Sequence, residues 1–391
     1  MNSGNRILAL IVFSQFCCTS LWFAGNGVLS DLIEYFNLTP AVLGHITSAV
    51  QLGFITGTLI FAFLTISDRF SPSKVFFFCS LAGALFNLAT ILENNNLLSL
   101  LSFRFITGFF LAGIYPVGMK IAADYFDKSL GKSLGYLVGA LVIGTAFPHL
   151  LKEFTGILPW KTVLMATSSL AVFGGILMLL FVPDGPFRKQ SQKLNLSAVF
   201  DIFKSSELRS AAFGYFGHMW ELYAFWAFVP VIITTYNSIN PAAMLNVPML
   251  SFFIIGIGGL GCVTGGYLSM TLGSKKVATT ALFLSGICCI ASPLIFSIES
   301  KYLFAGFLLF WGFVVQPDSP QFSTLVAQNA SPETKGTALT IVNCLGFSIT
   351  IFSIQLLNIL RETMDLRFIY LFLALGPVLG LLALRKTEHR A

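Results

Sequence analysis

The stretch LLSLLSFRFITGFFLAGIYPVGMK, from Leu97 to Lys120, is apolar enough to cross a membrane, yet it contains Arg104. A charged side chain at the centre of a bilayer costs from about 2.5 to more than ~10 kcal/mol, so such residues usually have a function. Gly108 and Gly113 follow, and small residues let helix backbones approach closely. Pro116 then removes a backbone donor from the helix. These features together are typical of a helix that moves, rather than of a passive anchor.

The composition around this stretch is that of a membrane protein. Of 391 residues, 55% are hydrophobic and only 10% are charged, whereas about a quarter of the residues in a soluble domain are charged. A chain of this kind cannot cover a soluble surface, so we expect the lipid bilayer to surround it. The net charge of +6 is spread over short loops and not gathered on one polar face, so we expect no nucleic-acid partner.

Apolar runs of about 20 residues, the length of a membrane-spanning helix, recur along the whole chain. We therefore predict an all-α membrane protein with twelve transmembrane helices. The first span is expected to remain in the protein, because no cleavage site typical of a signal peptide follows it. The predicted spans are 7–30, 41–66, 74–93, 97–120, 133–151, 160–182, 209–235, 246–270, 276–297, 301–326, 335–358 and 366–385.

The longest polar gap divides these spans six and six. It predicts an N-terminal six-helix bundle at 1–182, a cytoplasmic linker at 183–208 and a C-terminal six-helix bundle at 209–391. Lys and Arg are roughly three times as frequent on one side of the predicted membrane as on the other, which places both termini in the cytoplasm. We expect a multi-pass protein of a bacterial inner membrane.

The two halves resemble each other in sequence. A shift of about 204 residues places Pro116 on Pro320 and nearly aligns the polar segments that follow the fourth and tenth spans. Internal repeats of this kind are typical of secondary transporters, whose substrate sites lie near the middle of the membrane where the repeats meet.

The residues after the second span, Asp68-Arg69 and Lys74, resemble the Asp-Arg loop of the major facilitator superfamily. Arg104 with its following glycines is similar to the fourth helix of that family. The resemblance covers the whole chain and implies two pseudo-symmetric bundles that expose a central site to each side in turn. It also implies that Asp68 and Arg69 latch a cytoplasmic gate. The second copy of the loop keeps Gly266, Leu268, Gly273, Lys275 and Lys276, but not the acidic and basic pair.

Polar side chains in the N-terminal half favour a binding site. Trp22 and Asn26 share a face of the first span, within about 60° of each other and of two further polar residues, and they either line a cavity or bond to neighbouring helices. Arg104 and Tyr115 are about 20° apart on an ideal helix. Arg104 either binds an anionic group of the substrate, for which its forked donors are suited, or has a permanent partner on another helix. Gln51 in the second span is a further candidate.

The C-terminal half carries the acidic candidates. His218 and Glu221 are three residues apart and can share a helix face, and carboxylates and histidines in such places can bind and release protons. Asp318 lies between Pro317 and Pro320, which open the helix near an acid. We predict that Glu221, Asp318 and His218 couple transport to protons. The alternatives are a structural pair for His218 and Glu221, and a gate or helix-end contact for Asp318.

The complete set predicted to bind substrate combines one cation with aromatic and amide side chains. Its members are Arg104, Tyr115, Trp22, Asn26, Gln51, Trp220, Tyr223, Trp226, Gln316 and Asn343. We predict no catalytic residue, no cofactor and no metal site, because the seven cysteines lie in apolar runs and no further ligands gather near His218.

The sequence thus predicts a transporter and not an enzyme. The preferred function is proton-coupled symport of a small, anionic organic solute by a monomer. Proton-driven export of a drug, siderophore or metabolite is an alternative, although Phe147-Pro148 replaces the Gly-Pro pair of the drug-antiporter signature. An uncoupled facilitator and a non-transporting membrane sensor are the remaining alternatives.

Overall fold

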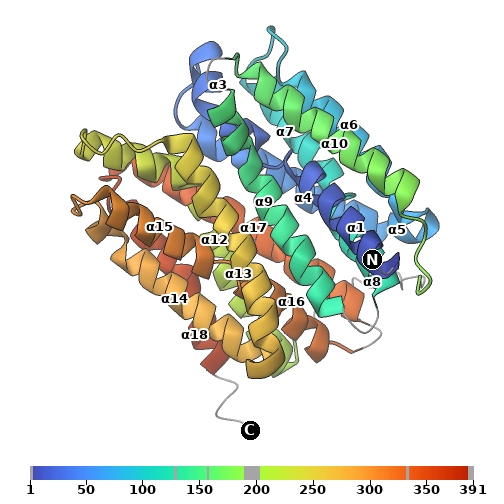
Figure 1. Cartoon of the computed structure of the whole chain (residues 1–391). Coiled ribbons are helices and arrows are strands. Elements are labelled where there is room, and N and C mark those ends of the chain that lie inside the picture. Colours follow the sequence, from blue (N-terminus) through green and yellow to red (C-terminus); the bar gives the residue numbers. More distant parts are fainter. Residues whose placement is uncertain (1–2, 127–129, 156–157, 189–202, 332–333, 386–391) are drawn as a thin grey trace. The chain divides into compact units, whose positions relative to one another are not determined.

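The structure, a computed structural model, describes residues 3–126, 130–155, 158–188, 203–331 and 334–385 (Figure 1). These residues form helices and turns, with no β-strand among them. The chain divides into two compact units, unit 1 at Met1–Leu194 and unit 2 at Asn195–Ala391. The division falls within the predicted linker, of which residues 189–202 lie outside the described residues.

Unit 1 is built from helices in the first six predicted spans. The α4 helix packs along α7, α6 along α10, and α1 against α9 and α10. The helices of unit 1 are α1 (Ser3–Thr19), α2 (Ala24–Gly27), α3 (Leu29–Tyr35), α4 (Val42–Phe63), α5 (Ile66–Arg69), α6 (Pro72–Ala89), α7 (Leu97–Leu111), α8 (Tyr115–Tyr125), α9 (Leu130–Phe154) and α10 (Lys161–Phe181).

Unit 2 is built in the same way from the last six predicted spans. The α12 helix packs against α16, α17 and α18, and α13 packs along α15. The helices of unit 2 are α12 (Ser206–Ile239), α13 (Val247–Leu272), α14 (Ser274–Ile295), α15 (Lys301–Val314), α16 (Asp318–Asn329), α17 (Lys335–Thr363), the 3-10 helix η1 (Ile369–Ala374) and α18 (Leu375–Arg385).

The all-α membrane fold is confirmed. Within the described residues, nine helices or helix pairs are long and apolar enough to cross a membrane, and shorter apolar helices lie at 5–19 and 369–385. Three of the predicted spans are broken, among them the tenth, where the prolines around Asp318 predict an opened helix. The first span breaks after Thr19, the fourth after Leu111 and the tenth after Val314.

Prolines explain two of these breaks. Pro116 lies in the first turn of α8, where a missing backbone donor costs no hydrogen bond. Pro317 directly precedes α16, and Pro320 lies in its first turn. The first span contains no proline, and its break depends on a side chain from another helix, as shown in the next section.

The repeat is visible in two close helix contacts, one in each unit. A Cβ added at Gly108 would lie 2.1 Å from the carbonyl oxygen of Val50, so α7 and α4 touch through their backbones. A Cβ added at Gly312 would lie 2.0 Å from the carbonyl oxygen of Ile254, which joins α15 to α13 in the same way. The shift that aligns Pro116 with Pro320 also aligns these two contacts.

The Gly312 contact gives a test of this packing. Gly312→Ala forces α15 away from α13, and overpacking of this kind costs about 1–3 kcal/mol. On the same helix, a Cβ at the exposed Gly306 meets nothing within 4 Å, so Gly306→Ala is the matched control. We expect Gly312→Ala to lower the thermal unfolding midpoint in detergent, and Gly306→Ala to keep or raise it. Equal midpoints for the two variants would contradict the packing described here.

Candidate functional site

Arg104 lies at the centre of unit 1 and is 1% exposed. Its Nη1 donates to the side-chain oxygen of Asn87 on α6 at 3.0 Å. Its Nη2 donates to the carbonyl oxygens of Leu21, at 3.1 Å, and Trp22. Leu21 and Trp22 form the turn between α1 and α2, so Arg104 connects α6 and α7 to the break in the first span.

This arrangement explains why the first span can break inside a membrane. The last carbonyl groups of a helix have no partner within it and carry partial negative charge, which a cation stabilises. Arg104 supplies the donors that water would supply in a soluble protein. Its hydrogen bonds go to neutral oxygens, and no carboxylate of the described residues forms an ion pair with it.

Gln51 on α4 is a buried polar group whose amide lacks hydrogen-bond partners among the described residues. On α4, Thr47, Gln51 and Phe54 share one helix face. Thr47 accepts a hydrogen bond from Asn26 at 2.8 Å, and the ring of Phe54 lies 4.8 Å from that of Trp22. The Gln51 side chain is fully buried, and neither atom of its amide has a hydrogen-bond partner among the described residues.

Tyr115 is separated from Arg104 by the break in the fourth span. It begins α8, beyond the break after Leu111, so the angle calculated for one continuous helix does not apply. The hydrogen bonds of Arg104 include none to Tyr115. The structure therefore joins Arg104 to Trp22 directly, and it joins Trp22 and Asn26 to the face of α4 that carries Gln51.

In unit 2, His218 and Asp318 form a buried pair. His218 Nδ1 on α12 lies 2.9 Å from Asp318 Oδ1 at the start of α16, and both side chains are 1% exposed. Asp318 occupies the first turn of α16, where the positive end of the helix dipole stabilises a carboxylate. Next to it in the α15–α16 turn, Gln316 is buried, and its Nε2 has no partner in the described part of the chain.

Glu221 is held by a different set of groups. Trp311 Nε1 on α15 donates to Glu221 Oε1 at 2.7 Å, and Ser285 Oγ on α14 donates to Oε2 at 2.8 Å. Glu221 is fully buried. Although His218 and Glu221 lie three residues apart on α12, each therefore has its own partners on other helices.

The aromatic and amide candidates of unit 2 differ in the helix that they contact, since Tyr223 and Asn343 take part in contacts between α12 and α17, whereas Trp220 contacts η1. The rings of Tyr223 and Trp226 lie 5.2 Å apart, and Tyr223 also contacts a phenylalanine of α17. Asn343 accepts a hydrogen bond from Tyr215 at 2.9 Å. Trp220 instead donates to the carbonyl oxygen of Phe372, so it connects α12 to η1.

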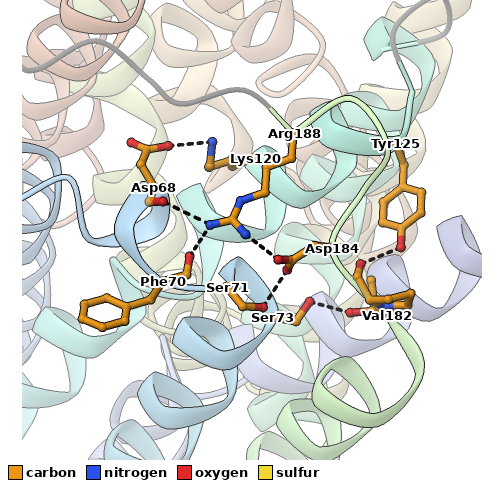
Figure 2. Close-up of polar contacts among 10 residues, drawn as sticks. Asp68, Phe70, Ser71, Ser73, Lys120, Tyr125, Val182, Asp184 and Arg188 are labelled. Carbon is orange, nitrogen blue, oxygen red and sulfur yellow. Dashed lines mark hydrogen bonds and ion pairs between the residues drawn. The ribbon is translucent and has the colours of Figure 1, made fainter.

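Figure 2 shows a polar cluster at the end of unit 1 where α5, α8 and the chain after α10 meet. Lys120 Nζ lies 2.8 Å from Asp68 Oδ1. Arg188 donates to the carbonyl oxygens of Asp68 and Phe70, and it pairs with Asp184. The chain leaving α10 is thereby fixed to the turn that carries the family-like Asp-Arg sequence.

Within that turn, the two gate candidates differ. Asp68 has the contacts just given, whereas Arg69 is exposed and forms no ion pair with a described residue. Ser71 adds a hydrogen bond to Asp184 at 2.6 Å, and Ser73 donates to Val182 at the same distance (Figure 2).

Sequence reasoning missed several of these partners. Asn87 was detectable, because it is a lone amide in an otherwise apolar span. Ser285 was not, because serines are common in membrane helices and this one is not set apart by its neighbours. No group of three or more histidines, cysteines or acids able to hold a metal is found in the described ranges.

The comparison with family models gives one match that covers most of the chain. The model of the Major Facilitator Superfamily matches residues 11–354. This range includes Arg104, Glu221 and Asp318.

Curated relatives match parts of the chain. The niacin transporter NiaP of Acinetobacter baylyi is 31% identical over 158 residues, which is 34% of this chain and 35% of that protein. A probable inorganic phosphate transporter 1-4 of Oryza sativa is 30% identical over 34% of this chain and 26% of its own length. The efflux pump FUBT of Fusarium oxysporum is 27% identical over 199 residues, which is 48% of this chain and 32% of that protein. The matched segments thus span about a third of these relatives.

Solved structures match over nearly the full length. A bacterial homologue of the human lysosomal transporter Spinster has a TM-score of 0.73 at 14% identity, over 100% of this chain and 98% of that one. The human organic anion transporter MFSD10 has a TM-score of 0.76, also at 14% identity, over 98% and 100%. At such identities the likeness concerns the fold alone. From the family match together with this fold, the chain belongs to the Major Facilitator Superfamily and is a multi-pass membrane transporter, not an enzyme.

Proposed function

We propose that this chain is a proton-coupled symporter of a small, anionic organic solute. It acts as a monomer in a bacterial inner membrane, with both termini in the cytoplasm, and works by alternating access. The observation that carries the proposal is the separation of buried charges between the units. Among the described residues, Arg104 in unit 1 is paired only with neutral oxygens, whereas unit 2 buries Glu221 and the His218–Asp318 pair.

The uncompensated charge of Arg104 supports an anionic solute. A cation inside a membrane is expensive to keep, and it attracts an anion strongly where the dielectric constant is low. Three of its hydrogen bonds already go to Asn87, Leu21 and Trp22, so Arg104 contributes chiefly its charge. Gln51 contributes direct hydrogen bonds to the solute, because neither polar atom of its amide has a hydrogen-bond partner among the described residues. Inorganic phosphate and organic anions, named for two of the similar proteins, are solutes of this charge.

The acids of unit 2 support proton coupling. The His218–Asp318 pair can hold one proton between an imidazole and a carboxylate, and Glu221 can be ionised or protonated in its own set of donors. A solute anion that enters with protons carries less net charge across the membrane. Coupling therefore lowers the electrostatic cost of moving the solute.

The cluster in Figure 2 supports a gate at the cytoplasmic end of unit 1. The distribution of Lys and Arg along the sequence supports a cytoplasmic location for this end. Asp68 takes part through Lys120 and Arg188, and Arg69 is exposed for contacts that change during transport.

Proton-driven export is the second candidate. The similarity to the efflux pump FUBT covers 48% of the chain, more than the similarity to NiaP does. Export uses the same buried acids with the opposite direction of solute movement.

Transport in proteoliposomes tests the proton coupling. We expect an inward proton gradient to drive accumulation of a labelled anion from a panel that includes niacin and inorganic phosphate. Glu221→Gln and Asp318→Asn should each reduce gradient-driven accumulation at least tenfold, because each removes a group that exchanges protons. The exposed Glu299 provides the control Glu299→Gln, which should transport normally.

Two outcomes would contradict this account of coupling. If both acid variants keep gradient-driven accumulation, the proton carriers are assigned wrongly. If the gradient drives the solute outward from loaded vesicles and never inward, the protein is an exporter.

A second prediction concerns the anion site. Gln51→Leu should weaken solute affinity about tenfold, because a hydrogen bond to a charged group contributes about 1.5–3 kcal/mol. Its thermal stability should be unchanged, since Gln51 has no hydrogen bond within the described chain to lose. Arg104→Lys should lower both affinity and stability, because three hydrogen bonds to Arg104 depend on its geometry.

Thr56→Val, on the same helix as Gln51, is the matched control, because within the described part of the chain the Thr56 hydroxyl bonds to the carbonyl of Leu52 in its own helix. Anion binding is measured directly on the purified variants in detergent, which separates the affinity for the anion from the rate of transport. An anion affinity in Gln51→Leu and Arg104→Lys equal to that of the control would refute the site.

A further inference from the structure

The carboxylate of Glu221 lies between two strong donors of different chemistry, with the thiol of Cys289 as a third and weaker partner. The indole N–H of Trp311 can only donate a hydrogen bond, and it contacts Oε1. The hydroxyl of Ser285 can donate or accept, and it contacts Oε2. The two oxygens of one carboxylate therefore face a fixed donor and a reversible one.

Ser285 has a second acceptor within reach. Its Oγ lies 3.2 Å from the carbonyl oxygen of Leu282, one turn earlier in α14. When Oε2 of Glu221 carries a proton, that proton can be donated to Ser285 Oγ, while the hydroxyl hydrogen of Ser285 turns to Leu282. Each heavy atom keeps its place, and both protonation states have their hydrogen bonds satisfied.

We propose that Ser285 and Trp311 are positioning residues that form, with Glu221, a proton site in which only the Ser285 hydroxyl reverses its hydrogen bond. The proton enters on Oε2 and leaves from it, and Trp311 donates to Oε1 in both states. This inference rests on the proposed proton coupling and goes further, because it assigns the proton to one oxygen and names the groups that hold it.

The site differs from the neighbouring acid. In the His218–Asp318 pair, the carboxylate of Asp318 lies 2.9 Å from an imidazole nitrogen. Glu221 has no cationic partner among its hydrogen bonds. The titratable groups that face it are Asp318 at the start of α16, Cys288 and Cys289 on α14, and His218 on its own helix.

The two donors should therefore affect proton binding unequally. Trp311 bonds more strongly to an ionised carboxylate than to a neutral one, because hydrogen bonds to charged groups are stronger. Its removal penalises mainly the ionised state. Removal of the Ser285 hydroxyl takes one hydrogen bond from the ionised state and one from the protonated state, so its two effects largely cancel.

Infrared difference spectroscopy on the full chain in lipid, without any solute, tests this inequality. The carboxyl C=O band that appears on acidification and is absent in Glu221→Gln reports protonation of Glu221. We expect Trp311→Phe to move the midpoint of this band upward by about one pH unit. Ser285→Ala should move the midpoint less than half as far, but shift the band frequency, because the acidic hydrogen loses its acceptor. Ser285→Thr keeps a hydroxyl and should restore the frequency.

The proposal is overturned by any of three results. The first is that Ser285→Ala moves the midpoint as far as Trp311→Phe does. The second is that Ser285→Ala leaves the band frequency unchanged. The third is that no carboxyl band depends on Glu221. Because this measurement uses no solute, its failure is distinct from failure of the transport proposal. If the bands behave as expected while transport ignores the proton gradient, the proton site stands and the coupling is refuted.

Discussion

Polar groups inside a membrane must find their partners within the protein, and the hydrogen bonds of Arg104 show how this chain meets that constraint. Two backbone carbonyls at the break of the first span accept hydrogen bonds from Nη2 of this guanidinium, and the side-chain oxygen of Asn87 accepts one from Nη1. The break and the charge depend on each other, since either one alone would leave buried groups unsatisfied. The turn that carries Trp22, and with it the surroundings of Gln51, depends on this interaction.

The two units use one backbone plan for different chemistry. The contact of Gly108 with Val50 is repeated by Gly312 with Ile254, so the α4–α7 pair of unit 1 and the α13–α15 pair of unit 2 are equivalent. The shift that aligns these glycines places the buried Leu308 at the position of Arg104. Unit 2 has its charged groups elsewhere, on α12 and at the start of α16. A duplicated scaffold therefore holds a cation in one copy and acids in the other.

Much of the fold could be predicted from hydropathy and prolines. The apolar runs gave the helices to within a few residues, and the prolines around Asp318 correctly indicated a broken tenth span. The break after Thr19 could not be predicted, because its cause lies on α7 and the first span contains no proline. Periodicity assigned His218 and Glu221 to one helix face, but it could not identify Asp318, Trp311 and Ser285 as their separate partners. Such partners are set by tertiary packing, which a single helix does not encode.

The central claim is that an anion and protons cross together. The most direct measurement records internal pH and solute content at the same time in proteoliposomes, with the membrane potential clamped at zero and no imposed pH gradient. An inward gradient of the anion should acidify the interior at a constant ratio of protons to solute. Solute entry without any change in internal pH would contradict the account.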